Sequence, residues 1–520
     1  MRTSREIVKS TGLLSLITIF SLGFGFLKEM IIAHHFGAGE QVDAFLVASI
    51  VPLSVPRIIT LAISLCFIPA YIEARQKDSR GAQNLLNFVL IGMLLFFSLC
   101  AVFFWWQAPG TIARLAPGFD AQALSLTTRL LHVLLPILFL FGLFRLNASL
   151  LNAHRSFAAP GLAVLLAPLA VIVAITALPG QPGVMRWGVA LTIGHGLQAA
   201  FLLILLFRQG LRPGLRTNLK DPVIKGFLCR ALPLILATSI NLLVLVIDRA
   251  MASKLLPGSI SALSYADKIF QVPLQAFILS IVTVMLPYAS VEFLHRDKGD
   301  FKKTVQLSIL MAAFVLLPVT AILVVMARPV VTVLLQRGAF DMEDTLVTSR
   351  ALVGFTSGYF TMAIYYIFQR ILIVMRKTPL LIVIAAANIA LKVLLNLLFI
   401  KIFDAPGIAV ASTLMFAITA LCMAVIVYRL LGGLDMRRMI RTIVKISLAA
   451  LTMAGGCLLS FGLLHNLTGD AGLGGQIAQI GLVSIAGLAL YALMVWLFRV
   501  PEAQKLYRLL IRSMPLGQRS

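Results

Sequence analysis

The chain has 520 residues, of which 60% are hydrophobic and only 12% are charged, and its net charge is +24. Its mean hydropathy of +0.98 excludes a soluble globular domain. The basic residues are scattered over many short segments and form no single face, which argues against nucleic-acid binding.

Fourteen apolar stretches are long enough to cross a bilayer, since a spanning helix needs roughly 20 apolar residues. In chain order they lie near residues 11–34, 44–72, 86–107, 123–152, 160–178, 187–207, 231–252, 259–290, 304–327, 345–373, 380–403, 406–428, 446–465 and 474–498. We therefore predict an all-α polytopic membrane protein with about fourteen transmembrane helices.

The loops between these stretches alternate in positive charge. With a cytoplasmic N-terminus, 29 Lys and Arg lie in inner segments and only 6 in outer loops. Short cytoplasmic loops carry such an excess of positive charge, so we predict that both termini are cytoplasmic.

An internal repeat relates the two halves. A shift of 218 residues lays 43–71 over 261–289 without a gap, with five identities. Because the shift spans six helices, an even number, both copies have the same orientation. The predicted domains are an N-lobe of helices 1–6 (1–208), a cytoplasmic linker (209–230), a C-lobe of helices 7–12 (231–430), and helices 13–14 with a basic cytoplasmic tail (431–520).

Motifs of enzymes and metal sites are absent from the sequence. It contains no phosphate-binding loop, no G-x-S-x-G, no H-E-x-x-H and no paired carboxylates, and its five cysteines lack metal-ligand spacing. We expect no catalytic activity, no cofactor and no metal.

Charged residues within the spans are the strongest functional signal. Nine are cationic: Lys28, Arg57, Arg129, Arg145, Arg249, Lys268, Arg350, Arg370 and Lys392. The carboxylates at similar depth are Glu29, Asp248 and Asp267, with Asp43 at an outer boundary. Buried charges need a partner or a wet cavity, and the surplus of cations predicts an anionic ligand such as a diphosphate. Arg129, Arg350 and Arg370 have the alternative of reaching the interface from helix ends.

Three pairs of these charges are consecutive: Lys28–Glu29, Asp248–Arg249 and Asp267–Lys268. Neighbours on a helix diverge around its axis, so we expect each side chain to find its partner on another helix or in a shared cavity. For Lys28, Arg249 and Lys268, and for Arg57, we favour ligand binding.

Residues 21–57, SLGFGFLKEMIIAHHFGAGEQVDAFLVASIVPLSVPR, resemble the opening signature of the MurJ/MviN lipid II flippases. That family belongs to the multidrug/oligosaccharidyl-lipid/polysaccharide exporter superfamily. Further similar segments follow in order at 151–169, 240–274, 334–340 and 376–379, so the resemblance spans roughly residues 10–430.

The resemblance implies a flippase of the bacterial cytoplasmic (inner) membrane. It would translocate an undecaprenyl-diphosphate-linked glycan precursor by alternating access for peptidoglycan synthesis, with lipid II as the leading substrate. Cations of helices 1, 2 and 8 would bind the diphosphate in a central cavity, which gives this role to Lys28, Arg57 and Lys268, with Asp43 as a partner at the outer gate. The other expected partners are membrane lipids and the cell-wall synthesis machinery. Lysine at 28 and 268 departs from the arginine usual in the family.

Some members of the family are coupled to sodium through carboxylate and amide ligands on helices 7, 11 and 12. Here Asn388 is followed one turn later by Lys392, where an anionic ligand is expected. The ammonium group would then pair with Asp248 and occupy the place of the ion; alternatively, Lys392 lines the cavity.

Other functions remain open at this stage. The first alternative is a flippase for O-antigen or exopolysaccharide repeat units. A membrane glycosyltransferase or polymerase is disfavoured because no acidic cluster or long outer loop is present. A drug/cation antiporter would require an anionic rather than a cationic cavity.

Overall fold

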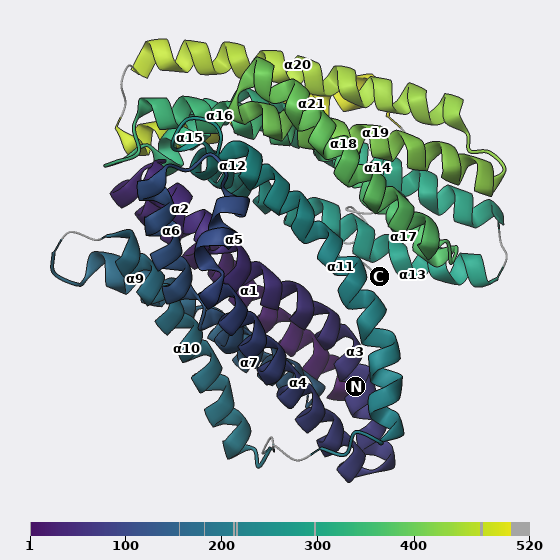
Figure 1. Cartoon of the computed structure of the whole chain (residues 1–520). Coiled ribbons are helices and arrows are strands. Elements are labelled where there is room, and N and C mark those ends of the chain that lie inside the picture. Colours follow the sequence, from purple (N-terminus) through teal and green to yellow (C-terminus); the bar gives the residue numbers. More distant parts are fainter. Residues whose placement is uncertain are drawn as a thin grey trace. The chain divides into compact units, whose positions relative to one another are not determined.

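The structure is a computed structural model that describes residues 2–154, 156–180, 183–211, 214, 217–295, 298–468 and 472–500. Within these ranges the chain forms helices and no strand, which confirms the predicted all-α class (Figure 1). The chain divides into two compact units, Met1–Ser261 with Arg337–Asp341, and Ala262–Gln336 with Met342–Ser520. The predicted basic tail beyond residue 500 lies outside the described residues.

The first unit contains the helices from α1 to α11. Their bounds are α1 Arg2–Phe36, α2 Glu40–Ala48, the π-helix η1 Ile50–Ser54, α3 Val55–Lys77, α4 Ser79–Trp106, α5 Ala108–Leu115, α6 Ala121–Leu134, α7 Ile137–Ala153, α8 Ala158–Ala163, α9 Leu166–Thr176, α10 Val184–Arg208 and α11 Pro222–Ala252.

Helix α12 begins at the end of the first unit, and the remaining helices form the second. Their bounds are α12 Ser259–Pro273, the π-helix η2 Leu274–Ile278, α13 Leu279–Leu294, α14 Lys298–Val325, α15 Ala327–Leu335, α16 Met342–Thr356, α17 Tyr359–Val374, α18 Thr378–Phe403, α19 Ala405–Leu431, α20 Met436–Thr468 and α21 Leu473–Leu497.

Each predicted apolar stretch corresponds to a helix or a broken helix. Among the residues searched, eleven helical segments are long and apolar enough to cross a membrane. A twelfth span is formed by α16 and α17 together, which meet at a bend of 42°. The other two predicted stretches coincide with α1 and α11, so the helices are consistent with the predicted fourteen.

Aspartates placed before the first turn start several helices. Asp78 accepts hydrogen bonds from the backbone N–H groups of Arg80 and Gly81 at the start of α4. Asp221 does the same for Val223 at the start of α11. Such caps satisfy backbone donors that the helix itself leaves unpaired. Part of the small acidic content is therefore used at helix ends on the predicted cytoplasmic side.

The breaks within helices recur in the two sequence repeats. The second span is interrupted by η1, which contains Pro52, and the eighth by η2, which follows Pro273. Short helices, α5 and α15, follow the third and the ninth span. Proline removes a backbone donor, and π-helical turns are a common response to a disrupted helix. This recurrence extends the sequence repeat beyond the aligned 29-residue stretch.

The compact units and the predicted lobes have different boundaries. Helix α11, predicted to open the C-lobe, packs along α3 and belongs to the first unit. Packing in one conformation and membership of a repeat are separate properties, so the assignment of 231–430 to a second lobe stays a prediction.

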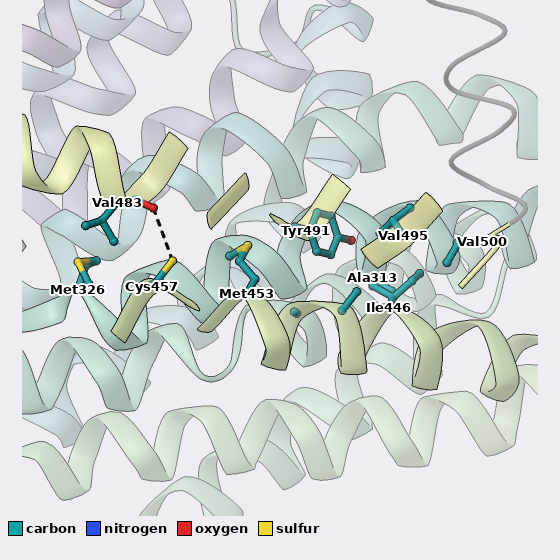
Figure 2. Close-up of a cluster of buried hydrophobic side chains, with 11 residues drawn as sticks. Ala313, Met326, Ile446, Met453, Cys457, Val483, Tyr491, Val495 and Val500 are labelled. Atoms are coloured by element: carbon teal, nitrogen blue, oxygen red, sulfur yellow. Dashed lines mark hydrogen bonds between the residues drawn. The ribbon is translucent and has the colours of Figure 1, made fainter. Parts of the chain in front are cut away.

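The last two helices pack together and against α14. Their shared core, shown in Figure 2, contains Ala313 of α14, Ile446, Met453 and Cys457 of α20, and Val483, Tyr491 and Val495 of α21. The Tyr491 hydroxyl donates to the backbone oxygen of Phe314 at 2.8 Å. These contacts hold α20 and α21 against α14 within the second unit.

Candidate functional site

Lys28 and Glu29 form an ion pair with each other in α1, the first predicted span. The Nζ atom of Lys28 lies 2.7 Å from Oε1 of Glu29, and both side chains are largely buried. Our expectation that these neighbours diverge was therefore wrong. The lysine stem is long and flexible enough to bring its ammonium round to the next residue. Part of the positive charge of Lys28 is thus compensated locally.

His195 of α10 lies within electrostatic reach of Lys28. Its Nδ1 atom lies 2.9 Å from Oε1 of Gln198, and both side chains are buried. The charge of Lys28 in the first span therefore acts on a polar residue of the sixth. The sequence alone does not single out His195, because a lone histidine in an apolar stretch gives no signal of its neighbours.

Arg57 and Arg145 bring two positive charges together in the first unit. Arg57 lies in the first turn of α3 and is exposed, and Arg145 lies in α7 and is largely buried. The charge of Arg57 acts on Arg145. The buried Nε atom of Arg145 has no hydrogen-bond partner among the described residues. Like charges at this depth favour an anion between or beside them. Arg145 is therefore a candidate ligand residue that the sequence analysis counted but did not select.

Asp43 binds the start of α12 with both oxygens of its carboxylate. Oδ2 accepts from the backbone N–H of Gly258 at 2.8 Å, and Oδ1 accepts from that of Ser261 at 2.7 Å. Asp43 is only 2% exposed and precedes the second span, and its burial raises its pKa to about 6. The hydrogen bonds oppose this shift because they favour the charged form. The carboxylate thus caps a helix 218 residues away.

Gly258 makes the close approach beside Asp43 feasible. Its φ of +91° lies in the left-handed region, and a Cβ atom there would collide with the carbonyl oxygen of Ala38. Glycine meets both requirements because it has no side chain. The turn after α1 and the start of α12 are therefore in direct backbone contact.

Two further loops, predicted to lie on the outer side, make equivalent contacts. In the 334–340 motif, the Ala339 N–H donates to the carbonyl oxygen of His34 at the end of α1, at 2.8 Å. In the loop before α6, the Gly118 N–H donates to Oγ of Ser253 after α11, at 3.2 Å. The ends of the first and seventh spans are each held by a loop from the other sequence repeat.

The second unit contains Lys268 in α12. Its side chain is partly buried, and the preceding Asp267 accepts from Nε2 of Gln271 at 3.3 Å. Phe270 of the same helix stacks on Tyr359 of α17. The Tyr359 hydroxyl also donates a hydrogen bond to the backbone oxygen of Phe270 at 2.8 Å. Lys268 thus lies in a helix that contacts α17 through Phe270 and Tyr359.

Lys392 is fully buried between α18 and α19. Its ammonium donates to the carbonyl oxygen of Ile408 at 3.0 Å and to the hydroxyl of Ser412. One turn earlier, Oδ1 of Asn388 accepts from Thr419 at 2.6 Å. Carbonyl and hydroxyl oxygens of α19 therefore surround a fixed positive charge, as they would surround a bound cation.

The structure groups the predicted residues only in part. Lys28, Arg57 and Asp43 lie in the first unit, together with Asp248 and Arg249 of α11, which are half-buried. Lys268, Asn388 and Lys392 lie in the second unit. The pairing of Asp248 with Lys392, and a common site for all these cations, stay predictions.

The fold and these charges define a polytopic helical membrane protein that carries ionisable side chains within its spans. The chain resembles a solved structure titled "Lipid II flippase MurJ, inward closed conformation" with a TM-score of 0.76, at 21% identity, covering 96% of this chain and 99% of that one. An inward-facing MATE family transporter of the MOP superfamily matches with a TM-score of 0.66 at 14% identity, covering 79% of this chain and 94% of the other. At these identities the likeness concerns the fold.

The family follows from the sequence. The family model "Lipid II flippase MurJ" matches residues 32–470, so the chain belongs to the MurJ family of lipid II flippases. The probable lipid II flippase of Vibrio cholerae serotype O1 is 27% identical over 515 residues, covering 91% of this chain and 94% of the relative. That of Buchnera aphidicola subsp. Baizongia pistaciae is 27% identical over 417 residues, covering 79% and 81%. The resemblance noted in the sequence is confirmed.

Proposed function

We propose that this protein moves lipid II from the inner to the outer leaflet of the cytoplasmic membrane by alternating access. Membership of the MurJ family and the apolar helices support transport of a lipid-linked substrate. The observation that carries the proposal is the pair of Arg57 and Arg145, two cations whose charges interact and which form no ion pair with a carboxylate among the described residues. Such a pair suits the oxygens of a diphosphate.

Lys28 and Lys268 extend this diphosphate site in our proposal. Lys28 is tied to Glu29, so its ammonium is held in place but only partly neutralised. Lys268 stands on a rigid turn that Phe270 and Tyr359 anchor. A lysine supplies a point charge and an arginine a planar pair of donors. In our proposal, Arg57 therefore orients the diphosphate, and the two lysines attract its negative charge.

The test is complementation of a strain depleted of its own lipid II flippase. Lys28→Ala, Arg57→Ala and Lys268→Ala should each fail to support growth while the protein still reaches the membrane. Lys28→Arg and Lys268→Arg should complement, because they retain the positive charge. Lys77→Ala, which removes an exposed cation paired with Glu73, is the control and should complement. Full complementation by all three alanine variants would exclude this site.

Asp43 in our proposal stabilises closure of the outer side. Its contacts with Gly258 and Ser261 join the second and eighth spans at their predicted outer ends. Opening to the outside requires these hydrogen bonds to break. Loss of the carboxylate should therefore make outer residues of the cavity more accessible to impermeant reagents, whereas Glu40→Gln, at an exposed neighbouring carboxylate, should not.

Lys392 in our proposal replaces a coupling cation. Its ammonium already fills the oxygen-lined position between α18 and α19, so transport should not require sodium. If Asp248 is its counter-charge, Lys392→Ala leaves that carboxylate unpaired, and breaking a buried pair costs about 3–5 kcal/mol. The double variant Asp248→Asn with Lys392→Ala should then lose less than the sum of the single changes. Independent addition of the two losses, or a sodium requirement of the unchanged protein, would contradict the pairing.

The orientation and the partners complete the proposal. The charge bias of the loops supports cytoplasmic termini. Delivery of lipid II to the outer leaflet would place the protein next to the machinery that polymerises the cell wall, which we propose as its physiological partner.

A further inference from the structure

A cavity of about 680 Å³ opens in the second unit at the predicted cytoplasmic ends of its helices. It is lined by Ser290, Glu292 and Phe293 of α13, Phe301 of α14, Arg376 before α18 and Leu430 of α19, among others. Each of these residues lies within three positions of the end of a predicted span. At a rise of about 1.5 Å per residue, this places the cavity at the depth of the lipid headgroups.

Glu292 supplies an incompletely used carboxylate in this cavity. Its Oε1 atom accepts from the Thr304 hydroxyl at 2.7 Å. Its Oε2 atom is buried and has no hydrogen-bond partner in the described part of the chain. A carboxylate can accept about four hydrogen bonds, so the described residues leave Glu292 with room for a further donor. Glu292 is also an acid on a side of the membrane where positive charge dominates, which makes a cationic group its natural ligand.

Arg376 supplies the opposite charge at the same cavity. Its φ is +59°, in the left-handed region that ordinary side chains avoid. The residue lies in the 376–379 motif, in the short turn between α17 and α18. A glycine would adopt this turn more easily, so the backbone alone does not account for an arginine at this position. The remaining wall is mostly apolar and includes two phenylalanine rings.

We propose that this cavity binds a phospholipid with a primary-amine headgroup, phosphatidylethanolamine or a lipid of the same chemistry. Its ammonium donates to Glu292, its phosphate accepts from Arg376, and its acyl chain covers the apolar wall. An anionic headgroup without an amine would be repelled by Glu292. A choline headgroup has the charge but no N–H to donate. The diphosphate of a polyprenyl lipid would bring two phosphates to a cavity with one arginine and one carboxylate.

The test is native mass spectrometry of the full chain titrated with lipids that share their acyl chains. Phosphatidylethanolamine should bind about tenfold more tightly than phosphatidylcholine, as expected for one charge-assisted hydrogen bond near the surface. The mono- and dimethylated lipids should fall between them as N–H donors are removed. Equal binding of the whole series, or a preference for phosphatidylglycerol, would overturn the proposal without any variant being needed.

Two variants separate the roles of the two charges. Glu292→Gln retains an acceptor for Thr304 and should abolish the preference for ethanolamine over choline. Arg376→Gly suits the positive φ and should weaken both lipids equally, because both carry the phosphate. Glu73→Gln, an exposed carboxylate of the first unit, is the matched control and should change neither. A preference that survives Glu292→Gln, or an Arg376→Gly effect on one lipid only, would refute the assignment. None of these measurements depends on lipid II transport.

Discussion

Replacing Asp43 by asparagine should remove a specific part of the pH dependence of stability. In the folded chain, burial raises the pKa of Asp43 to about 6 from an ordinary value of 3.8. A raised pKa means that the folded state favours the protonated form. The stability contributed by Asp43 is therefore fully present below pH 3.8 and is lost as the pH rises through about 6.

The magnitude follows from this pKa difference of about two units. One unit corresponds to about 1.36 kcal/mol, so ionisation of Asp43 should cost the folded state about 3 kcal/mol in total and about 2.4 kcal/mol between pH 4 and pH 7, because the unfolded aspartate is already more than half ionised at pH 4. Solvent screening does not reduce this value much, because the side chain is only 2% exposed. The cost is tolerated because the ionised carboxylate still accepts two backbone hydrogen bonds from the start of α12.

The assay compares the unfolding of the detergent-purified wild type and Asp43→Asn at pH 4 and pH 7. The wild type should lose about 2.4 kcal/mol relative to the variant on going from pH 4 to pH 7. Taking the difference between the two proteins cancels the titration of all other groups. The control Glu40→Gln removes an exposed carboxylate of the same helix and should track the wild type. A wild-type-minus-variant difference that is equal at both pH values would refute the reasoning.

Three further predictions concern topology, charge and backbone geometry. In a background without native cysteines, Gly472→Cys should react with an impermeant thiol reagent in intact cells and Lys77→Cys only after permeabilisation; the reverse pattern would invert the topology. Arg145→Leu should lower transport about tenfold or more and Arg145→Lys should retain most of it, measured by lipid II exposure on the outer surface, and equal activity of both would exclude Arg145 from the site. Gly258→Ala should destabilise the protein more than Gly210→Ala in thermal unfolding, since both glycines have positive φ but only Gly258 is crowded by a neighbouring backbone.

The helices could be predicted because the membrane leaves few options. A backbone in hydrocarbon must satisfy its own hydrogen bonds, so each long apolar stretch becomes a helix. The breaks within the helices are harder to predict from the sequence. Pro52 and Pro273 signal a break, but the π-helical form of η1 and η2 depends on how neighbouring helices accommodate the displaced backbone.

The candidate site could be predicted by residue type but not by contact. Cations within apolar stretches, such as Arg57 and Lys392, stand out in the sequence because a charge within a bilayer is costly. Their partners do not stand out. The backbone N–H groups of Gly258 and Ser261 cannot be recognised in the sequence as partners of Asp43, because every residue except proline carries such a donor. The prediction that Lys28 and Glu29 diverge was wrong because the lysine stem is long enough to reach the neighbouring carboxylate.

The packing of α11 along α3 and the contacts of loops predicted to lie on the outer side explain why the compact units do not coincide with the sequence repeats. The loop containing Ala339 binds the end of α1, and the loop containing Gly118 reaches Ser253 after α11. Asp43 contacts Ser261, its own counterpart under the 218-residue shift. Each repeat thus contributes an outer segment to the other, and residues up to Ser261 together with Arg337–Asp341 fall into the first unit. In the alternating-access cycle that we propose, this exchange must be undone for the predicted outer side to open, so we expect the free energy of closure to be concentrated in these loops rather than in the long apolar helices.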